Sequence, residues 1–365
     1  MKILVYLLTT LFLFSACKKN EENEEMSDAV LQTEIIKENL SHVWEILYGP
    51  DKHLWFTERS GKISRLDLET HEVKPLLQIA DVQAKGEGGL LGMVIHPDFS
   101  AQPYVYVVYN YSSGEYKEKV VRYTYSNETL SSPQIIMDNI PAANIHNGSR
   151  LLITPDNKLL VTIGDASNAN RAQDKGSLSG KILRLNLDGS VPSDNPFENS
   201  PVWTYGHRNA QGLVQVGQKV FSSEHGPNSD DEVNIIEKGK NYGWPNVKGF
   251  CDESGEQEFC SQNDIREPLK AYTPTIATCG LAYYNHDEIP QWKNSLLMVT
   301  LKDQTLRQLK LSSDQTSILS ESEFYRSEFG RLRSICISPD GQVFIGTSNG
   351  SNDRIIAIRA AADAR

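Results

Sequence analysis

The sequence has few positive charges, and this deficit limits what the protein binds. Its 36 lysine and arginine residues are outnumbered by 47 aspartate and glutamate residues, which gives a formal net charge of −11 at pH 7. A protein that binds a phosphate backbone needs a basic face, so this balance argues against nucleic acid as a partner. Solubility alone accounts for the acidic surplus.

Long apolar runs are absent except for one at the N-terminus. This run extends from Ile3 to Phe14 and precedes Ser15-Ala16-Cys17. It has the length of a signal-peptide core and is too short to span a bilayer comfortably. A basic start, an apolar core and small residues before a cysteine resemble a bacterial lipoprotein signal, although Phe14 stands where leucine is usual.

We therefore predict a lipoprotein signal peptide over residues 1–16 and lipidation of Cys17, with ordinary secretion and cleavage near Ala16 as the alternative. In both cases the protein is exported, to the periplasm or as an outer-membrane or cell-surface lipoprotein whose lipid anchor is its only membrane contact. Residues 17–35 are predicted to form an acidic flexible tether, because their first part has almost no apolar side chains. We expect the folded domain over residues 36–360.

Cysteine is scarce, with five residues in a chain of 365. Apart from Cys17, the sequence contains Cys251 and Cys260, which bracket a polar loop, and Cys279 and Cys336. Because export places the protein in an oxidising compartment, we predict a disulfide between Cys251 and Cys260. Cys279 and Cys336 either pair or remain buried thiols, and the sequence leaves both possibilities open.

Helical periodicity is nearly absent outside residues 30–40, and short strands take its place. A Pro-Asp turn precedes an alternating apolar strand four times, before residues 54–58, 104–109, 159–165 and 343–347. Proline presets φ and aspartate bonds its own backbone, so this pair favours a turn. Similar companion strands follow at residues 61–66 and 180–185.

Repeated short strands over some 330 residues predict an all-β fold, a six-bladed β-propeller. Seven blades or a large array of β-sandwiches are the alternatives. In a propeller, the innermost strands and their loops converge on a central channel. Polar residues at strand ends can therefore meet although they are far apart in the sequence.

Two such residues are His146, which precedes a glycine and a strand, and Asp165, which ends the next strand. Taken alone, His146 would be read as a surface or core histidine. An aspartate that holds the imidazole in one tautomer is the usual arrangement for a general base near neutral pH. We therefore predict that His146 is a base and that Asp165 orients it.

The segments Trp203–Leu213 and Glu224–Pro227 concentrate groups suited to an anionic ligand and a hard cation. Arg208 and Asn209 offer a guanidinium group and an amide, while Gly226 and Pro227 can present carbonyl oxygens to a cation. Further cations are Lys302, Arg331 and Arg333. Singly they read equally well as solvated edge charges, but together they indicate a polycarboxylate or phosphorylated ligand. The acidic residues at 230–232 bind calcium or, in the simpler interpretation, cap a turn.

Short sequence motifs of the chain resemble those of the soluble pyrroloquinoline quinone (PQQ)-dependent glucose and aldose sugar dehydrogenases, which are six-bladed propellers that oxidise sugars. The similarity covers most of residues 40–355. The matching phrases stand, in the order of the family, at Gly88–Gly92, His96–Phe99, His146–Gly148, Thr162–Asp165, Gly180–Arg184, Tyr205–Asn209, Glu224–Pro227, Asn241–Pro245 and Arg331–Arg333.

The resemblance implies oxidation of the anomeric hydroxyl of an aldose to a lactone, by base-assisted hydride transfer to PQQ in the presence of Ca²⁺. By position, His146 is the base, Asp165 its partner, and Arg208 and Asn209 contact the reactive side of PQQ. It further implies that Lys302, Arg331 and Arg333 pair with the PQQ carboxylates, that Thr275 touches PQQ, that Gly226 and Pro227 bind Ca²⁺, and that Glu232 and the Tyr242 carbonyl form a second, structural Ca²⁺ site.

Three residues depart from the pattern of the family. Glu87 replaces a glutamine that contacts the cofactor, and it could repel an anionic quinone, be neutral or point elsewhere. Cys279 replaces a small polar residue in a loop, and Thr273 stands where some glucose-active members have an aromatic. A non-catalytic binding propeller and a Ca²⁺-dependent lactonase remain alternative functions, while the sugar, the electron acceptor and the oligomeric state are not specified by the sequence.

Overall fold

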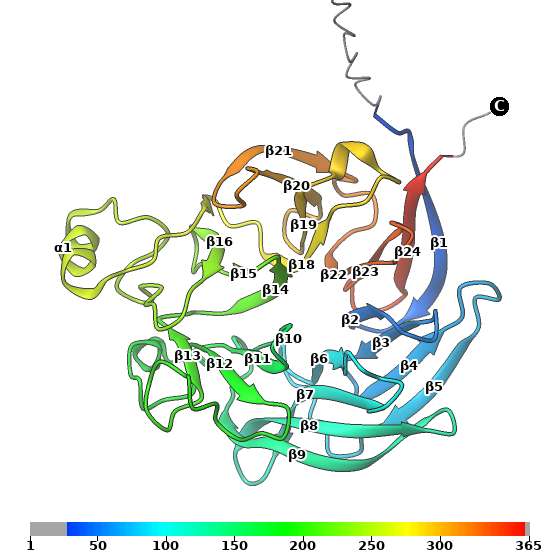
Figure 1. Ribbon diagram of the computed structural model, residues 1–365, viewed down its shortest axis with the longest axis horizontal. Coiled ribbons are helices and arrows are strands. Elements are labelled where there is room, and N and C mark those ends of the chain that lie inside the picture. Colours follow the sequence, from blue (N-terminus) through cyan, green and yellow to red (C-terminus); the bar gives the residue numbers. More distant parts are fainter. Residues whose placement is uncertain (1–27, 362–365) are drawn as a thin grey trace, which may run out of the picture.

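The computed structural model describes residues 28–361, which form six four-stranded antiparallel sheets arranged around a common centre (Figure 1). This arrangement confirms the predicted six-bladed β-propeller and excludes seven blades and a sandwich array. The predicted signal peptide, Cys17 and most of the predicted tether lie outside the described residues. No helix within residues 28–361 is long and apolar enough to cross a membrane.

Each of the first five blades consists of four strands that are consecutive in the sequence. The first blade consists of β2 (Val43–Tyr48), β3 (Leu54–Glu58), β4 (Lys62–Leu66) and β5 (Val73–Gln78). The second consists of β6 (Leu90–Ile95), β7 (Tyr104–Ser112), β8 (Tyr116–Ser126) and β9 (Thr129–Pro141). The third consists of β10 (Gly148–Ile153), β11 (Lys158–Ile163), β12 (Lys181–Asn186) and β13 (Val202–Tyr205), with the 3-10 helix η1 (Ala169–Ala172) before β12.

The fourth blade consists of β14 (Ala210–Val216), β15 (Lys219–Glu224), β16 (Asp231–Ile236) and β17 (Lys270–Tyr272), with α1 (Ser254–Asn263) before β17. The fifth consists of β18 (Thr278–Tyr284), β19 (Ser295–Thr300), β20 (Leu306–Leu311) and β21 (Ile318–Phe324), with η2 (Pro290–Trp292) before β19. The sixth consists of β22 (Leu332–Ile337), β23 (Val343–Thr347), β24 (Asp353–Ala360) and, at its outer edge, β1 (Leu31–Leu40).

The Pro-Asp turns have the role that the repeat predicts. Each one joins the innermost strand of a blade to the second strand, ahead of β3, β7, β11 and β23. The companion strands at residues 61–66 and 180–185 correspond to β4 and β12, the third strands of their blades. Local turn chemistry therefore repeats once per blade in four of the six blades.

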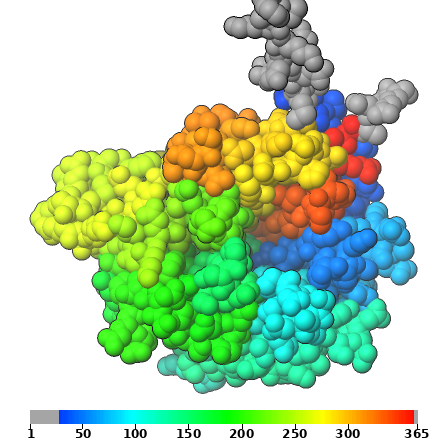
Figure 2. All heavy atoms as spheres, viewed as in Figure 1, coloured from blue at the N-terminus to red at the C-terminus, as the bar shows by residue number. Residues whose placement is uncertain are grey.

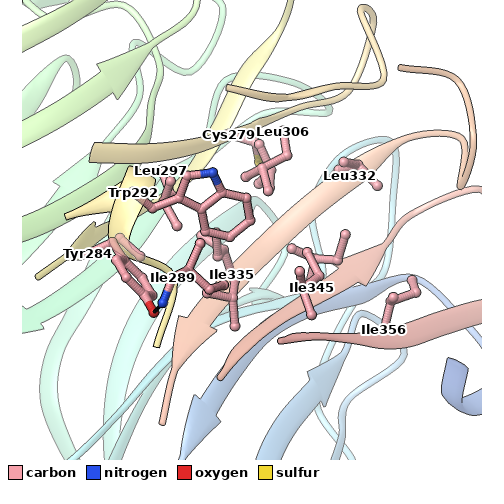
Figure 3. Close-up of a cluster of buried hydrophobic side chains, with 14 of the residues drawn as sticks. Cys279, Tyr284, Ile289, Trp292, Leu297, Leu306, Leu332, Ile335, Ile345 and Ile356 are labelled. Carbon is pink, nitrogen blue, oxygen red and sulfur yellow. Dashed lines mark hydrogen bonds between the residues drawn. The ribbon is translucent and has the colours of Figure 1, made fainter. Parts of the chain in front are cut away.

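The hydrophobic core of the described residues is divided among the interfaces between blades. Each of its six clusters joins two neighbouring blades, so that every sheet is covered on both faces. Figure 3 shows the cluster between the fifth and sixth blades, where Trp292 and Tyr284 pack edge-on at a centroid distance of 5.9 Å near Ile335 and Ile345. Burying each such side chain contributes roughly 1.5–3 kcal/mol to folding, which holds the ring of blades together.

The N-terminal strand corrects the predicted boundary between tether and domain. Residues 31–35, assigned to the tether, belong to β1, and the residues that retained some helical periodicity form this strand instead of a helix. β1 pairs with β24 from Leu31 opposite Ala360 to Leu40 opposite Asp353 (Figure 1). Its polar, half-exposed side chains resemble those of a tether because the strand is at an outer edge and is stabilised by backbone hydrogen bonds to the far end of the chain.

The predicted disulfide is present. Cys251 and Cys260 are bonded, and the bridge ties α1 to the loop before it in a lobe that projects from the fourth blade (Figure 2). Cys279 and Cys336 are free thiols. Cys279 is on β18, a strand that is buried between blades, which corrects its assignment to a loop.

Candidate active site

The residues around the central cavity follow one rule of the fold. They stand at the start of an innermost strand or at the end of a second strand, and these ends lie on the same face of the propeller. The cavity has a volume of about 400 Å³, and its lining includes His42, Trp44, Arg59, Glu87, Leu91, Asn147, Gly148, Gln211, His225, Ala277, Leu301, Arg331, Arg333 and Asn349. The expectation that strand ends bring distant polar residues together is confirmed.

His146 and Asp165 meet beside this cavity. His146 precedes β10 and Asp165 follows β11, and the imidazole Nδ1 lies 2.8 Å from Asp165 Oδ1. Gly164 permits this approach, because a Cβ at that position would be 2.0 Å from the His146 carbonyl oxygen. When Nδ1–H donates its hydrogen bond to the carboxylate, the other ring nitrogen, Nε2, carries no proton and is free to act as a base.

Glu87 contacts the backbone of His146. Its Oε2 accepts a hydrogen bond from the His146 N–H at 3.2 Å, and the side chain also lines the cavity. Of the three possibilities considered for this carboxylate, the structure excludes the one in which it points elsewhere, because it lies at the cavity and contacts the segment that carries His146.

Three arginine side chains line the cavity without a carboxylate partner anywhere in residues 28–361. They are Arg59, Arg331 and Arg333, whereas Arg150, deeper in the ring of inner strands, pairs with Glu45. Burial, and then the charge of Arg333, lowers the pKa of both Arg59 and Arg331. Like charges confined in this way are relieved by an anion between them.

Arg333 also has a nitrogen atom that lacks a hydrogen-bond partner. It is 8% exposed, its Nη1 donates to Gln211 Oε1 at 3.0 Å, and its Nε has no hydrogen-bond partner. A buried donor without a partner is costly. The cavity therefore has the electrostatic properties of a site for an anionic, oxygen-rich ligand.

Arg208 and Asn209 lie next to the His146 segment, immediately before β14. Arg208 Nη1 donates to the His225 carbonyl at 3.1 Å, its Nε is buried without a partner, and burial lowers its pKa. Asn209 Oδ1 accepts from the Gly148 N–H at 3.0 Å and from Gln211 Nε2 at 3.1 Å. Arg208 thus retains donors for a ligand, while the Asn209 oxygen is used within the protein.

Lys302 and Thr275 lie together near the rim of this cavity, beside its lining residues Leu301 and Ala277. Lys302 Nζ donates to Thr275 Oγ1 at 2.9 Å, and this contact is exposed to solvent. The two residues are thus brought together, but at the entrance rather than within the lining.

The residues predicted to bind calcium surround a smaller cavity next to Arg208. Gly226, Pro227, Glu232 and Tyr242 all line it. Burial, and then the charge of Glu224, raises the pKa of Glu232 to about 8. Within residues 28–361, no three His, Cys, Asp or Glu side chains gather as metal ligands, so that a cation here would depend largely on carbonyl oxygens.

The acidic residues after this loop support the simpler interpretation of a capped turn for Asp231. Its carboxylate accepts hydrogen bonds from the backbone N–H groups of Gly226, Ile276 and Ala277, at 2.8, 2.8 and 2.6 Å. His207 is also structural: it is fully buried, and its ring lies 2.8 Å from both Glu224 and Thr204.

Several site residues were missed by the reasoning from sequence. The central cavity also contains Arg59, His42, Trp44 and Gln211, and Trp244 contacts Asp165. Arg59 could have been predicted from the sequence, because it directly follows β3, a strand that was identified, and polar residues at strand ends were already taken as site candidates. Trp244 was noticed only as part of a family phrase.

The buried carboxyl group of Glu118 contacts Ser149 on β10, and its pKa leads to a prediction about how stability depends on pH. Glu118 is 1% exposed, accepts hydrogen bonds from Ser149 Oγ at 2.7 Å and Asn110 Nδ2 at 3.3 Å, and has no cationic partner in the described chain. Burial raises its pKa from 4.5 to about 8. The folded state therefore holds a proton that the unfolded state releases, so stability falls as pH rises between these values, by about 1.4 kcal/mol per pH unit.

Glu118→Gln, which mimics the protonated form, should match the wild type below about pH 4.5, the pKa of the unfolded state, and become progressively more stable than it toward pH 8. Urea unfolding of both proteins across this range measures the effect. Because the other buried carboxyl groups are the same in both proteins, parallel pH dependences would show that Glu118 is ionised in the fold.

Comparison with known proteins is consistent with this geometry. The family model described as Glucose / Sorbosone dehydrogenase matches residues 40–357. An uncharacterized protein of Synechocystis is 34% identical, over 90% of this chain and 90% of its own. Quinoprotein glucose dehydrogenase B of Acinetobacter calcoaceticus is 33% identical, over 87% of this chain and 85% of its own.

A solved structure shares the fold over nearly its whole length. The PQQ-bound aldose sugar dehydrogenase of Streptomyces coelicolor superposes with a TM-score of 0.78 and 31% sequence identity, over 91% of this chain and 98% of the other.

Proposed function

The chain belongs to the glucose/sorbosone dehydrogenase family, and we propose that it is a PQQ- and Ca²⁺-dependent enzyme that oxidises the anomeric hydroxyl of aldoses to lactones. The observation that carries this proposal is the meeting of two features: a base oriented by a carboxylate, His146 with Asp165, and a cavity lined by arginines without carboxylate partners. A hydride transfer from a sugar to an anionic quinone needs both.

The donors of the cavity fit PQQ, which carries three carboxylates. Arg331 and Arg333 would bind them from the start of β22, and Lys302 with Thr275 would do so from the rim. The partnerless Nε atoms of Arg208 and Arg333 are the donors that the protein itself leaves unused. When bound, PQQ supplies the carbonyl that accepts the hydride.

The residues of the chain then have distinct tasks. His146 Nε2 accepts the proton of the anomeric hydroxyl, which makes departure of the hydride easier. Asp165 keeps the imidazole in the required tautomer and stabilises the imidazolium that forms. Arg208, whose guanidinium group is held in place by the His225 carbonyl, stabilises the negative charge that develops on the acceptor oxygen as a preorganised donor. Glu87, which stands where the family has glutamine, accepts a hydrogen bond from the His146 backbone N–H and positions this segment.

For calcium, we propose the carbonyl oxygens of Gly226 and Pro227 beside Arg208, and a second, structural site at Glu232 and the Tyr242 carbonyl. A Cβ on residue 226 would lie 1.9 Å from the Ser229 oxygen, so glycine is needed for this loop to fold back tightly. Burial, and then the charge of Glu224, raises the pKa of Glu232, and a cation bound beside these two carboxyl groups would favour the ionised form of Glu232.

The proposal is tested by reconstitution. Purified protein with PQQ and Ca²⁺ should reduce an artificial dye when supplied with aldoses, and omission of PQQ should abolish dye reduction. No dye reduction across a panel of aldoses, together with no PQQ binding, would refute the proposal. Lactone hydrolysis that needs Ca²⁺ but no quinone would indicate a lactonase instead.

A further inference from the structure

Trp244 reaches the Asp165 carboxylate from the loop between β16 and β17. Its indole Nε1–H donates to Asp165 Oδ2 at 2.9 Å, while Oδ1 lies 2.8 Å from His146 Nδ1 and accepts from the Ser167 N–H at 2.9 Å. Asp165 is only 2% exposed. Three donors on three separate segments thus hold both oxygens of this carboxylate, and the indole is the donor on Oδ2.

The indole is itself held in place by its neighbours. The Trp244 N–H donates to the Gly206 carbonyl at 3.0 Å, and the Trp244 carbonyl accepts from Gln173 Nε2 at 2.7 Å. The side chains of Gln173 and Asn241 exchange two further hydrogen bonds, at 3.0 and 2.9 Å. These bonds fix the backbone of Trp244 to the loops that follow β11 and β13, so the indole N–H has little freedom to leave Asp165.

The ring of Trp244 also contacts the other side of the site. The Arg208 guanidinium carbon lies 5.3 Å from the ring centroid, within cation–π range. Trp244 further lines the small cavity next to Gly226 and Pro227. One side chain therefore contacts the carboxylate that orients the base, the arginine beside it and the candidate calcium loop.

We propose that Trp244 is a positioning residue that locks Asp165, and through it His146, in the arrangement needed for proton removal. Without the indole N–H, Oδ2 loses its donor in a buried place and the carboxylate is free to turn. The imidazole then loses its fixed tautomer, and Nε2 is less often available as a base. This proposal rests on the proposed function, because it assigns a task to the base of that reaction.

Trp244→Phe isolates the hydrogen bond, because phenylalanine keeps an aromatic face for Arg208 but has no donor. In protein reconstituted with PQQ and Ca²⁺, we expect kcat to fall at least about 10-fold, as activity does when the hydrogen-bond partner that orients a metal-binding histidine is lost. The sugar KM should change by less than about twofold, because the lost interaction orients the base rather than binding the sugar. In the ligand-free protein, the ¹⁵N NMR signals of the His146 ring should shift from one tautomer toward an average of two.

Trp55→Phe is the matched control. It removes an indole–aspartate hydrogen bond of the same 2.9 Å length, to Asp51, in the first blade and outside the cavity. It should leave kcat and the His146 signals unchanged, even if it lowers thermal stability.

Wild-type kcat and unchanged His146 signals in Trp244→Phe would overturn the proposal, as would equal losses in both variants. If the wild type shows no PQQ-dependent activity, the proposed function fails, and the ¹⁵N spectra of the ligand-free variants still support or overturn the role of Trp244 in orienting His146.

Discussion

His146→Gln is expected to lower kcat for aldose oxidation by about 10³-fold, within the range measured for loss of a general base. Glutamine can still donate to Asp165 from its amide, so the carboxylate keeps a partner, but it cannot accept a proton. PQQ affinity should change little, because His146 is at the edge of the cavity and the carboxylates are bound by other residues. Steady-state dye reduction measures kcat, and a parallel titration measures PQQ binding.

The control for this variant is His71→Gln, in the turn between β4 and β5 and distant from the cavity. It should retain the wild-type kcat. A His146→Gln enzyme with more than about a tenth of the wild-type kcat would show that another group removes the proton, since a lost base costs at least about 10²-fold.

The double substitution Arg331→Met and Arg333→Met should weaken PQQ binding by about 10³-fold. Each hydrogen bond between an arginine and a carboxylate contributes about 1.5–3 kcal/mol, and two such partners would be removed. Methionine keeps much of the apolar length of the side chain, and far-UV circular dichroism verifies that the propeller is intact. The dissociation constant is measured by titrating the purified variant with PQQ.

Arg326→Met provides the comparison, because Arg326 is an exposed arginine that pairs with Glu323 and Asp303 and does not line the cavity. It should bind PQQ as the wild type does. Equal affinity of the double variant and the wild type would place the carboxylates of the ligand elsewhere.

The fold could be predicted well where local chemistry repeats. At the Pro-Asp turns before β3, β7, β11 and β23, a few neighbouring residues determine where the next strand begins and that the chain reverses its direction there. β1 could not be found this way, because Leu31 owes its conformation to Ala360 at the other end of the chain. Its polar side chains alone favour a tether, and only closure of the ring makes it a strand.

The site residues show the same difference: those at recognisable strand ends could be predicted, and those placed by contacts distant in sequence could not. His146 and Asp165 were found because each stands at a recognisable strand end. Trp244 contacts Asp165 across 79 residues of sequence, and no local pattern indicates that its indole turns toward that carboxylate. Glu118 was missed because it is flanked by lysines in a strand that reads as exposed, whereas ring closure buries it against Ser149.

The central claim is that the arginine-lined cavity beside His146 binds PQQ, and titration of the ligand-free wild-type protein with PQQ in the presence of Ca²⁺ tests it most directly. Absorbance should show saturable binding of one PQQ per chain, with a spectrum different from that of free PQQ. A PQQ spectrum that stays the same at every protein concentration would contradict the account.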